Sequence, residues 1–465
     1  MAKSERPDPH VVIIGGGFGG LEAARTLGGE HVRVTLIDKR NHHLFQPLLY
    51  QVATAALSDN DIAAPIRKVL AGQRNTTVLL DRVVAIHKDR KTIQLTQGEL
   101  AYDDLIVAAG VTNDYFGKPQ WEADAPGLKS LEEALDIRRR VLLAFEAAEK
   151  ESDPEIRRAY LTFVVIGGGA TGAEMAGALT EIARKTLTKN FRHFDPKEAR
   201  VVLLEGGPRI LAAFPEELSE RARHDLQDLG VEVQLKTLAQ KIDERGVQTA
   251  NEFIPSRTVI WAAGVRAVPL LNTLGVKQDR AGRVVVNPDL TVEGAPGVYV
   301  IGDCASFAVE GGILPGVAQV AIQQGRHAAK NLLARHAGKP QTEFKYFDKG
   351  SMATLGRNRA IAYSAGFKLS GFIAWLAWAF IHVLYLVSFR SRIAVLMEWA
   401  WAYFSYNRSA RIILDAAIAL PGREAKNAPA AAPTPALAAA PPKTMDGDAM
   451  LGGTAVHVAA EAGAR

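Results

Sequence analysis

Two stretches of the chain carry glycines at the spacing that loops use to bind the pyrophosphate of a dinucleotide. In each copy an apolar run precedes the glycines, which predicts a buried parallel strand, and a helix is expected to begin directly after them. The first glycine permits the tight turn, the second lets the backbone approach the phosphates, and the third lets the helix pack on the strand. The free N–H groups at the helix N-terminus then face the negative charge. The motif glycines are Gly15, Gly17 and Gly20 in "HVVIIGGGFGG" and Gly167, Gly169 and Gly172 in "LTFVVIGGGATG".

An acidic residue ends the strand that is predicted after each glycine loop. The first strand, "VRVTLID", ends at Asp38, and the second, "RVVLLE", ends at Glu205. An acid at this position can accept hydrogen bonds from ribose hydroxyls, although a structural acid at a strand end is the alternative in both copies. The second spacing is longer because Thr186–Ala199 intervenes, which we interpret as a longer helix followed by a surface loop.

The repetition continues beyond the glycine loops. Tyr102–Gly110 ("YDDLIVAAG") and Arg257–Gly264 ("RTVIWAAG") read as apolar strands that end in Ala-Ala-Gly, each at a similar distance after its own loop. A further strand in "TVEGAPGVYVIGDCAS" then leads to Gly302-Asp303, after the second copy is complete. The sequence therefore predicts an α/β fold of two Rossmann-like dinucleotide-binding domains, with the second inserted in the first.

This order of motifs resembles the two-dinucleotide-binding-domain flavoproteins over residues 10–330. The resemblance implies that the first glycine loop and the Gly-Asp pair hold FAD without a covalent bond, with the Asp on the ribityl chain. It also implies that the inserted domain binds NADH. The predicted FAD contacts are Gly15, Gly17, Phe18, Gly19, Gly20, Asp38, Lys39, Ala109, Gly110, Gly302 and Asp303. The predicted NADH contacts are Gly167, Gly169, Gly172, Glu174, Glu205, Ala263 and Gly264.

The single cysteine, Cys304, narrows the chemistry. Disulfide reductases and sulfide:quinone oxidoreductases of this superfamily need a pair of redox cysteines, so both activities are excluded unless another subunit supplies a thiol. We interpret Cys304 as a small packing residue, with a redox role as the alternative. One cysteine permits no intramolecular disulfide, which favours a reducing compartment. No metal site is predicted.

Three further stretches resemble the type II NADH dehydrogenases, the single-subunit NADH:quinone oxidoreductases. They are Asn41–Thr54, Leu314–Gly325 and Phe344–Arg357. The resemblance implies an FAD enzyme that sits on a membrane, oxidises NADH and passes two electrons to a membrane quinone. It also implies that the pattern Ala318–Gln323 lies beside the flavin and the quinone.

Two glutamines of this pattern, Gln319 and Gln323, stand one turn apart on one face of the predicted helix. Amides there can donate hydrogen bonds to a quinone carbonyl while negative charge develops on its oxygen. The alternative is a polar helix face that contacts flavin phosphates or water.

Two charged residues are assigned by the family resemblance. Lys349 resembles the family's lysine near the flavin edge. Many members carry a second carboxylate four residues after the acid that is Glu174 here, but this chain has Ala178 at that position. Glu181 lies three residues further on and is either a substitute in a polar or proton-relay role or a helix-surface glutamate.

The segment Phe372–Phe389 ("FIAWLAWAFIHVLYLVSF") carries no formal charge. As a helix it would be about 27 Å long, at ~1.5 Å per residue, which nearly spans a bilayer core. Its polar-tipped aromatic residues fall on one stripe, which favours a helix lying in the headgroup layer. Together with the amphipathic segment Ile393–Ile413 it predicts an in-plane anchor; a spanning helix, core helices and a dimer interface are the alternatives. The stripe consists of Trp375, Trp378, His382, Tyr385 and Phe389.

Composition fits a largely water-soluble protein at a membrane. The net charge of +5 over 465 residues is too diffuse to indicate nucleic acid but suits an anionic lipid surface. "MAKSERPDPH" lacks an apolar signal region, so we expect a peripheral protein on the cytoplasmic face of the cell (inner) membrane. No chain of intramembrane acids is visible, so proton pumping is not expected. The sequence does not decide whether the protein forms a homodimer.

The predicted domain bounds are 8–125 and 281–345 for the FAD domain, 126–280 for the NADH domain, 346–420 for the anchor and 421–465 for a disordered Pro/Ala-rich tail. Two other functions are compatible with the motifs. One is a soluble-type NAD(P)H oxidase or ferredoxin reductase, against which the paired glutamines and the anchor weigh. The other is a membrane-bound redox sensor that binds both nucleotides without rapid turnover.

Overall fold

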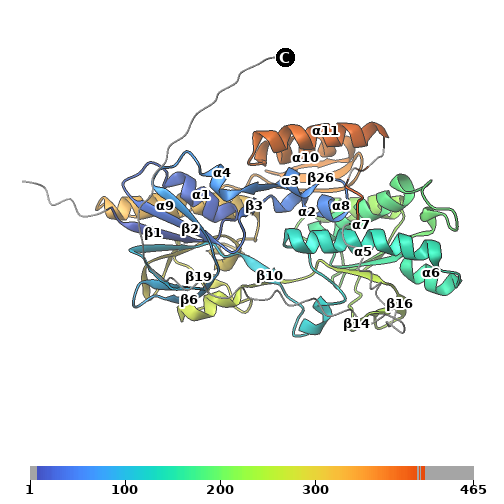
Figure 1. The fold of residues 1–465 in the computed structure, drawn as a ribbon, viewed down its shortest axis with the longest axis horizontal. Helices are drawn as coiled ribbons and strands as arrows, with labels where there is room; N and C mark the ends of the chain where they lie inside the picture. Colours follow the sequence, from blue (N-terminus) through green and yellow to red (C-terminus); the bar gives the residue numbers. More distant parts are fainter. Residues whose placement is uncertain (1–7, 406–407, 409, 414–465) are drawn as a thin grey trace, which may run out of the picture. The chain divides into compact units, whose positions relative to one another are not determined.

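Parallel pairing of apolar runs builds the first sheet of the structure (Figure 1), a computed structural model that describes residues 8–405, 408 and 410–413. Across the sheet the strands are β20 (Thr291–Val292), β21 (Ala295–Val300), β9 (Asp104–Val107), β1 (His10–Ile14), β2 (Arg33–Asp38) and β5 (Thr76–Leu80). Only the edge strand β20 pairs antiparallel. Every residue of β9 is buried, as expected for a parallel sheet covered on both faces. On this sheet α1 (Phe18–Thr26) and α9 (Ala318–His336) pack along each other.

The inserted sheet repeats this design with four parallel strands. In order they are β13 (Val231–Gln234), β12 (Arg200–Leu204), β11 (Thr162–Ile166) and β17 (Thr258–Trp261). The chain enters and leaves this part through β10 (Val111–Asn113) and β18 (Val265–Ala267), which pair antiparallel. The prediction of one dinucleotide-binding domain inserted in another is confirmed.

The helix after the second glycine loop, α7 (Ala170–Glu181), continues as a π-helical turn, η3 (Ile182–Thr186). The longer helix predicted from the sequence therefore ends at the first residue of the intervening stretch. The rest of that stretch is irregular apart from the 3₁₀ turn η4 (Pro196–Glu198). A π turn inside a helix often accompanies a functional site.

A third part follows α9. It is an antiparallel sheet of β25 (Ser351–Gly356), β26 (Arg359–Ser364) and β27 (Phe367–Ser370), covered by α10 (Gly371–Tyr385) and α11 (Phe389–Ser405) (Figure 1). The sequence did not predict this sheet. Its first strand packs on α7 at Gly177, where an added Cβ would lie 2.0 Å from the carbonyl oxygen of Leu355.

Shorter elements connect these parts. The helices are α2 (Leu49–Ala53), α3 (Asp59–Ile62), α4 (Ile66–Val69), α5 (Leu131–Lys150), α6 (Pro154–Tyr160) and α8 (Glu216–Leu229). The 3₁₀ turns are η1 (Gln46–Leu48), η2 (Pro119–Glu122), η5 (Pro269–Leu274) and η6 (Gly302–Cys304). The small strands are β3 (His42–Leu44), β4 (Ala63–Pro65), β6 (Val83–His87), β7 (Thr92–Leu95), β8 (Glu99–Ala101), β14 (Lys241–Asp243), β15 (Gly246–Gln248), β16 (Phe253–Pro255), β19 (Val284–Val285), β22 (Ala305–Ser306), β23 (Ala308–Val309) and β24 (Gly312–Ile313).

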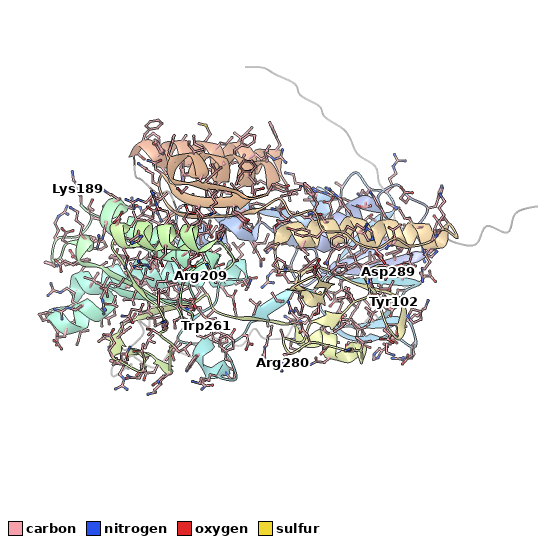
Figure 2. The ribbon with its side chains drawn as sticks, turned by 180° about the vertical axis from the view of Figure 1, so that it is seen from behind. Tyr102, Lys189, Arg209, Trp261, Arg280 and Asp289 are labelled. Atoms are coloured by element: carbon pink, nitrogen blue, oxygen red, sulfur yellow. The ribbon has the colours of Figure 1, made fainter. Side chains whose placement is uncertain are left out.

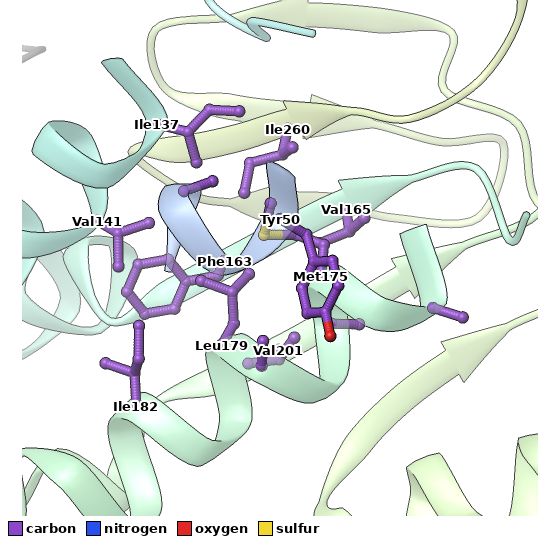
Figure 3. Close-up of a cluster of buried hydrophobic side chains, with 14 of the residues drawn as sticks. Tyr50, Ile137, Val141, Phe163, Val165, Met175, Leu179, Ile182, Val201 and Ile260 are labelled. Carbon is purple, nitrogen blue, oxygen red and sulfur yellow. The ribbon is translucent and has the colours of Figure 1, made fainter. Parts of the chain in front are cut away.

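One apolar core joins the inserted sheet to α2 from the N-terminal part and to α10. Figure 3 shows Tyr50 of α2 beside Met175 of α7 and Val165 of β11. Trp378 of α10 belongs to the same core. This core therefore holds α2, the inserted sheet and α10 together, although they are distant in sequence.

Within the predicted aromatic stripe, Trp378 and His382 face the protein, which corrects the prediction that the whole stripe lies in a headgroup layer. Tyr385 and Phe389, at its other end, are 37% and 74% exposed. Trp378 is 2% exposed and its ring stacks on Trp399 at a centroid distance of 5.1 Å, while His382 lies 4.6 Å from Trp378. The outward face is aliphatic and phenyl instead, with Ile373 67% and Phe380 66% exposed. Among the described residues, no helix combines the length and apolarity needed to cross a bilayer.

Candidate functional site

The first glycine loop is shaped by close backbone contacts. Gly15 has a φ of +101°, and an added Cβ would lie 2.3 Å from the carbonyl oxygen of Ala108. A Cβ on Gly20 would lie 1.8 Å from the carbonyl oxygen of Gly15. At Gly17, which precedes α1, an added Cβ would meet nothing within 4 Å. The loop is therefore tight against its own strand and open on the side where a phosphate would approach the helix N-terminus.

Asp38 fixes this loop through both carboxylate oxygens. Its Oδ2 accepts a hydrogen bond of 2.6 Å from the N–H of Gly16, and its Oδ1 accepts one of 2.7 Å from the N–H of Arg40. Each oxygen keeps a further lone pair for a ribose hydroxyl. Beside it, burial lowers the pKa of Lys39. The ring of Phe18 packs edge-on against His43, with centroids 5.0 Å apart.

The second loop reproduces this geometry. A Cβ on Gly167 (φ +110°) would lie 2.7 Å from the carbonyl carbon of Ala262, and one on Gly172 would lie 1.8 Å from the carbonyl oxygen of Gly167. Glu205 accepts hydrogen bonds from the N–H groups of Gly168 (2.6 Å) and Gly207 (2.5 Å). Again the middle glycine, Gly169, is open to solvent.

Each glycine loop and its acid form what we call a nucleotide cradle, and the loops after β9 and β17 complete the two cradles. Ala109-Gly110 and Ala263-Gly264 follow these strands, and both glycines adopt positive φ, +70° and +73°. Gly19 packs between the FAD-side helices, where its carbonyl oxygen would lie 2.3 Å from a Cβ on Gly325 of α9. The predicted loop residues therefore gather around two equivalent cradles.

Asp303 lies in η6, just after strand β21 of the first sheet. Burial raises the pKa of its carboxyl, and the charges of Lys129 and Arg283 lower it in part. No residue in the described ranges donates a hydrogen bond to this carboxylate, although Gln324 accepts one of 2.7 Å from the neighbouring N–H of Gly302. A largely buried carboxylate without a protein donor fits a ligand that brings hydroxyl groups.

Cys304 is buried behind this acid. Its sulfur lies 3.2 Å from the carbonyl oxygen of Ile301, and burial raises the pKa of the thiol to about 11. Such a thiol is a poor nucleophile at neutral pH, which supports the packing role.

The two glutamines of α9 have different surroundings. The amide of Gln323 bonds the backbone of Phe347 twice, since its Nε2 donates to the carbonyl oxygen at 2.9 Å and its Oε1 accepts from the N–H at 3.0 Å. The amide of Gln319 donates a long bond of 3.5 Å to the carbonyl oxygen of Gly350, and its Oε1 is buried without a partner in the described structure. Gln323 therefore anchors the 344–350 segment. Of the two glutamines, only Gln319 keeps a side-chain atom without a hydrogen-bond partner in the described structure.

Lys349 lies in that segment and reaches the C-terminal end of α10. Its Nζ donates a hydrogen bond of 2.8 Å to the hydroxyl of Tyr385. Lys349 thus connects the predicted flavin edge with the end of α10.

A pocket of about 790 Å³, counting its open mouth, lies between α2, α7, β25, α10 and α11. Its walls combine indole rings with polar groups, which is the usual lining of a site for a flat, mainly apolar ligand. The polar lining includes Tyr50, Gln51, Glu174, Glu181 and Arg408. Sequence reasoning missed Tyr50, Gln51 and Arg408 as individual candidates, although the first two lie within a stretch that carried the family resemblance.

Glu174 is the buried acid of this pocket. Its Oε1 accepts a long hydrogen bond of 3.4 Å from the N–H of Thr354, and burial raises the pKa of its carboxyl to about 8. It was predicted as an NADH contact, and the structure places it in the wall of the pocket. The carboxyl is therefore mostly protonated at neutral pH.

Glu181 is held by two cationic residues from the C-terminal part. Its Oε1 accepts a hydrogen bond of 2.7 Å from the backbone N–H of Arg357, and its Oε2 pairs with the guanidinium of Arg408 at 3.1 Å. Arg408 also donates to the carbonyl oxygens of Thr54 (2.6 Å) and Ala178 (3.4 Å). A purely surface role for Glu181 is thereby disfavoured, because the acid ties α7 to the segment after α11.

Replacement of Glu174 by glutamine should stabilise the protein at neutral and mildly alkaline pH. Below pH 4.5 the carboxyl is neutral in the folded and unfolded states, whereas between pH 4.5 and about 8 it ionises only when unfolded. The wild type therefore loses about 1.4 kcal/mol of unfolding free energy per pH unit in that window, relative to the glutamine variant. Urea unfolding at pH 5 and pH 7.5 measures the difference. The prediction would be contradicted if the difference in unfolding free energy between wild type and Glu174→Gln were the same at both pH values. It would also be contradicted if the exposed control Glu216→Gln showed the same pH-dependent difference.

Comparison with known proteins follows the same division of the chain. The family model for pyridine nucleotide-disulphide oxidoreductases matches residues 9–325, and the model for the NDH2 C-terminal domain matches residues 349–406. The type II NADH:quinone oxidoreductase Ndh of Mycobacterium tuberculosis is 46% identical over 421 residues, covering 87% of this chain and 90% of that protein. A type II NADH:quinone oxidoreductase of Staphylococcus aureus is 31% identical over 375 residues, covering 78% of this chain and 91% of that protein.

Solved structures share the fold. NDH2 of Plasmodium falciparum in complex with NADH superimposes with a TM-score of 0.80 at 20% identity, covering 86% of this chain and 99% of that one. The sulfide:quinone oxidoreductase of Aquifex aeolicus gives a TM-score of 0.67 at 18% identity, covering 85% and 95%. These two likenesses concern the fold alone, whereas identity over nearly the full length decides the family. The chain belongs to the type II NADH:quinone oxidoreductase family.

Proposed function

We propose that this protein oxidises NADH and passes two electrons, through a non-covalently bound FAD, to a quinone dissolved in a membrane, without pumping protons. One observation carries the proposal. The pocket between α7 and the two C-terminal helices has a polar inner wall, and those same helices expose an apolar outer face. A lipid-soluble substrate can reach such a pocket from the bilayer side, while the nucleotide cradles stay in water.

The residues of the first cradle fit FAD. The open position at Gly17 would admit the pyrophosphate, Asp38 would accept a ribose hydroxyl, and the Asp303 carboxylate would accept the ribityl hydroxyls. When bound, FAD supplies the acceptance of a hydride and the transfer of two electrons. Gln319 and Lys349 would border the flavin edge, and Gln323 would support them by holding the 344–350 segment.

The second cradle fits NADH, and we expect a preference for NADH over NADPH. Glu205 stands where the 2′-hydroxyl of the adenosine ribose would lie, so a 2′-phosphate would meet a carboxylate. The guanidinium of Arg209, labelled in Figure 2, is held by the carbonyl oxygen of Ala212 at 3.0 Å. Repulsion of at least ~1.4 kcal/mol gives a ratio of kcat/KM values of about tenfold or more. Steady-state rates with both cofactors measure it, and comparable values would refute the assignment.

The outer face of α10 and α11 is proposed to lie on lipid. Its large exposed side chains are Phe372, Ile373, Leu376, Phe380, Leu384, Phe389, Ile393, Leu396, Met397, Trp401 and Phe404. An apolar surface of this extent needs lipid or a partner. Arg390 is exposed in the first turn of α11 and suits anionic headgroups. We place this face on the cytoplasmic side of the cell membrane, where NADH is available.

A steady-state assay with NADH and a ubiquinone analogue tests the proposed function. Stoichiometric NADH oxidation and quinol formation is the expected result. Rapid oxygen consumption without quinone would instead indicate an NADH oxidase. Binding of both nucleotides without turnover would indicate a redox sensor.

A further inference from the structure

Three side chains of the pocket form a hydrogen-bonded chain. The indole Nε1 of Trp399 donates to the Oε1 of Gln51 at 2.7 Å. The Nε2 of Gln51 donates to the hydroxyl oxygen of Tyr50 at 2.9 Å. All three residues line the pocket, and they come from α2 and α11, which are far apart in sequence.

The chemistry of these groups fixes the direction of the chain. An indole N–H can only donate, so the atom of Gln51 that faces Trp399 must be its carbonyl oxygen. The NH₂ group of Gln51 then faces Tyr50, whose oxygen must accept. The hydroxyl proton of Tyr50 is therefore turned away from Gln51. No residue within the described ranges accepts that proton, so Tyr50 holds an unused donor at the pocket.

Tyr50 is a fixed donor. The residue is 6% exposed, and Figure 3 shows its ring among apolar side chains, with Met175 beside it. Burial and the nearby Glu174 raise the pKa of its hydroxyl well above the ordinary value, so the proton is retained. A second unused donor lines the same pocket, because the indole Nε1 of Trp378 is buried without a partner in the described structure.

A quinone carbonyl is a hydrogen-bond acceptor only, so it requires donors of this kind. We propose that the hydroxyl of Tyr50 donates a hydrogen bond to a carbonyl oxygen of the quinone, and that Gln51 and Trp399 are positioning residues which aim it. The inference rests on the proposed function. The quinone gains two electrons and two protons to become the quinol: NADH supplies a hydride through the flavin, which accounts for both electrons and one proton, and water supplies the second proton. Tyr50 stabilises the charge that develops on the oxygen and keeps its own proton.

The substitution Tyr50→Phe removes this donor and little else. Loss of a donor to a developing oxyanion lowers the rate roughly 100-fold, so we expect a fall of that order in kcat with a ubiquinone analogue. Reduction of the flavin by NADH, followed in a stopped-flow instrument, should change by less than twofold. The matched control is Tyr102→Phe, because Tyr102 is also buried but lies in the first dinucleotide-binding domain (Figure 2).

The positioning role is tested by a double-mutant cycle. Gln51→Met keeps the approximate volume but removes both hydrogen bonds, so the Tyr50 hydroxyl can rotate. We expect a loss of about threefold to tenfold in quinone reduction in the wild-type background and no further loss in the Tyr50→Phe background. A structural role for Gln51 would give the same loss in both backgrounds and would overturn the positioning role.

One further variant separates this inference from the proposed function. Ala178→Leu fills the pocket from α7 without altering Tyr50. If Ala178→Leu blocks quinone reduction while a folded Tyr50→Phe variant stays within twofold of the wild type, the Tyr50 inference is wrong and the pocket stands. If the wild type reduces quinone and neither substitution changes that rate, the quinone binds elsewhere. The Tyr50 inference and the assignment of the pocket are then both wrong. A wild type that does not reduce quinone would refute the proposed function itself.

Discussion

Substitution of Ile373, Phe380 and Phe404 by serine should release the protein from phospholipid vesicles. These side chains are 67%, 66% and 83% exposed, and they lie on the outer face of α10 and α11. If each contributes ~2 kcal/mol when its apolar surface leaves water, their joint removal weakens partitioning by about 10⁴-fold. Co-sedimentation with vesicles of phosphatidylcholine and phosphatidylglycerol measures the partitioning. NADH:ferricyanide activity should be retained, because a soluble acceptor does not require the bilayer.

A matched control keeps the interpretation specific. Leu80 and Leu238 are exposed to 60% and 70% but lie on neither α10 nor α11, so their replacement by serine should leave vesicle binding intact. Unchanged binding of the triple variant would refute the lipid role. Conversion of a wild-type dimer to monomers would identify the face as a subunit interface. Deletion of the whole C-terminal region is a poorer test, since Trp378 and Trp399 also form walls of the pocket.

The variant Asp303→Ala should lose most of its flavin. We expect the wild type to be purified with about one FAD per chain, held in part by hydrogen bonds from ribityl hydroxyls to this carboxylate. Hydrogen bonds to a charged group contribute about 1.5–3 kcal/mol each, so loss of two of them weakens binding by at least ~100-fold. Flavin absorbance relative to protein absorbance after gel filtration measures the occupancy.

The folded state should survive this substitution, because no described residue donates a hydrogen bond to Asp303. Circular dichroism of the variant should therefore match that of the wild type stripped of flavin. Asp303→Asn keeps one acceptor oxygen and should retain intermediate occupancy. Full occupancy in the alanine variant would show that the Gly-Asp pair does not hold the ribityl chain.

The two dinucleotide cradles were predictable because backbone sterics leave a local mark in the sequence. A Cβ on Gly20 or Gly172 would lie 1.8 Å from a carbonyl oxygen, so only glycine is compatible with these turns. The acids Asp38 and Glu205 were predictable because of their position in the sequence. Asp38 is the last residue of the largely buried strand β2, and Glu205 directly follows the largely buried strand β12.

The orientation of α10 could not be predicted from periodicity. Apolar residues surround this helix, so the pattern shows which side chains share a face but not which face meets the protein. Trp378 and His382 were assigned to the headgroup layer because of their polar tips. They instead line or pack beside a pocket, where those tips serve the interior.

The pocket itself depends on contacts between distant segments. Gln51 meets Trp399 across 348 positions of the chain, and Glu181 meets Arg408 across 227. No local spacing encodes such pairs. The antiparallel sheet that begins at Ser351 was missed as well, although it brings Thr354 to Glu174. The predicted Pro/Ala-rich tail, residues 421–465, lies outside the described residues.

Anaerobic double mixing in a stopped-flow instrument tests the central claim most directly. The flavin-loaded protein is mixed first with NADH and then with a ubiquinone analogue, while the flavin absorbance is followed. We predict that NADH bleaches the flavin completely, and that quinone restores the absorbance at least as fast as steady-state turnover. Bleaching that quinone does not reverse, or turnover with quinone in which the flavin is never reduced, would contradict the proposed transfer of electrons from NADH through FAD to quinone.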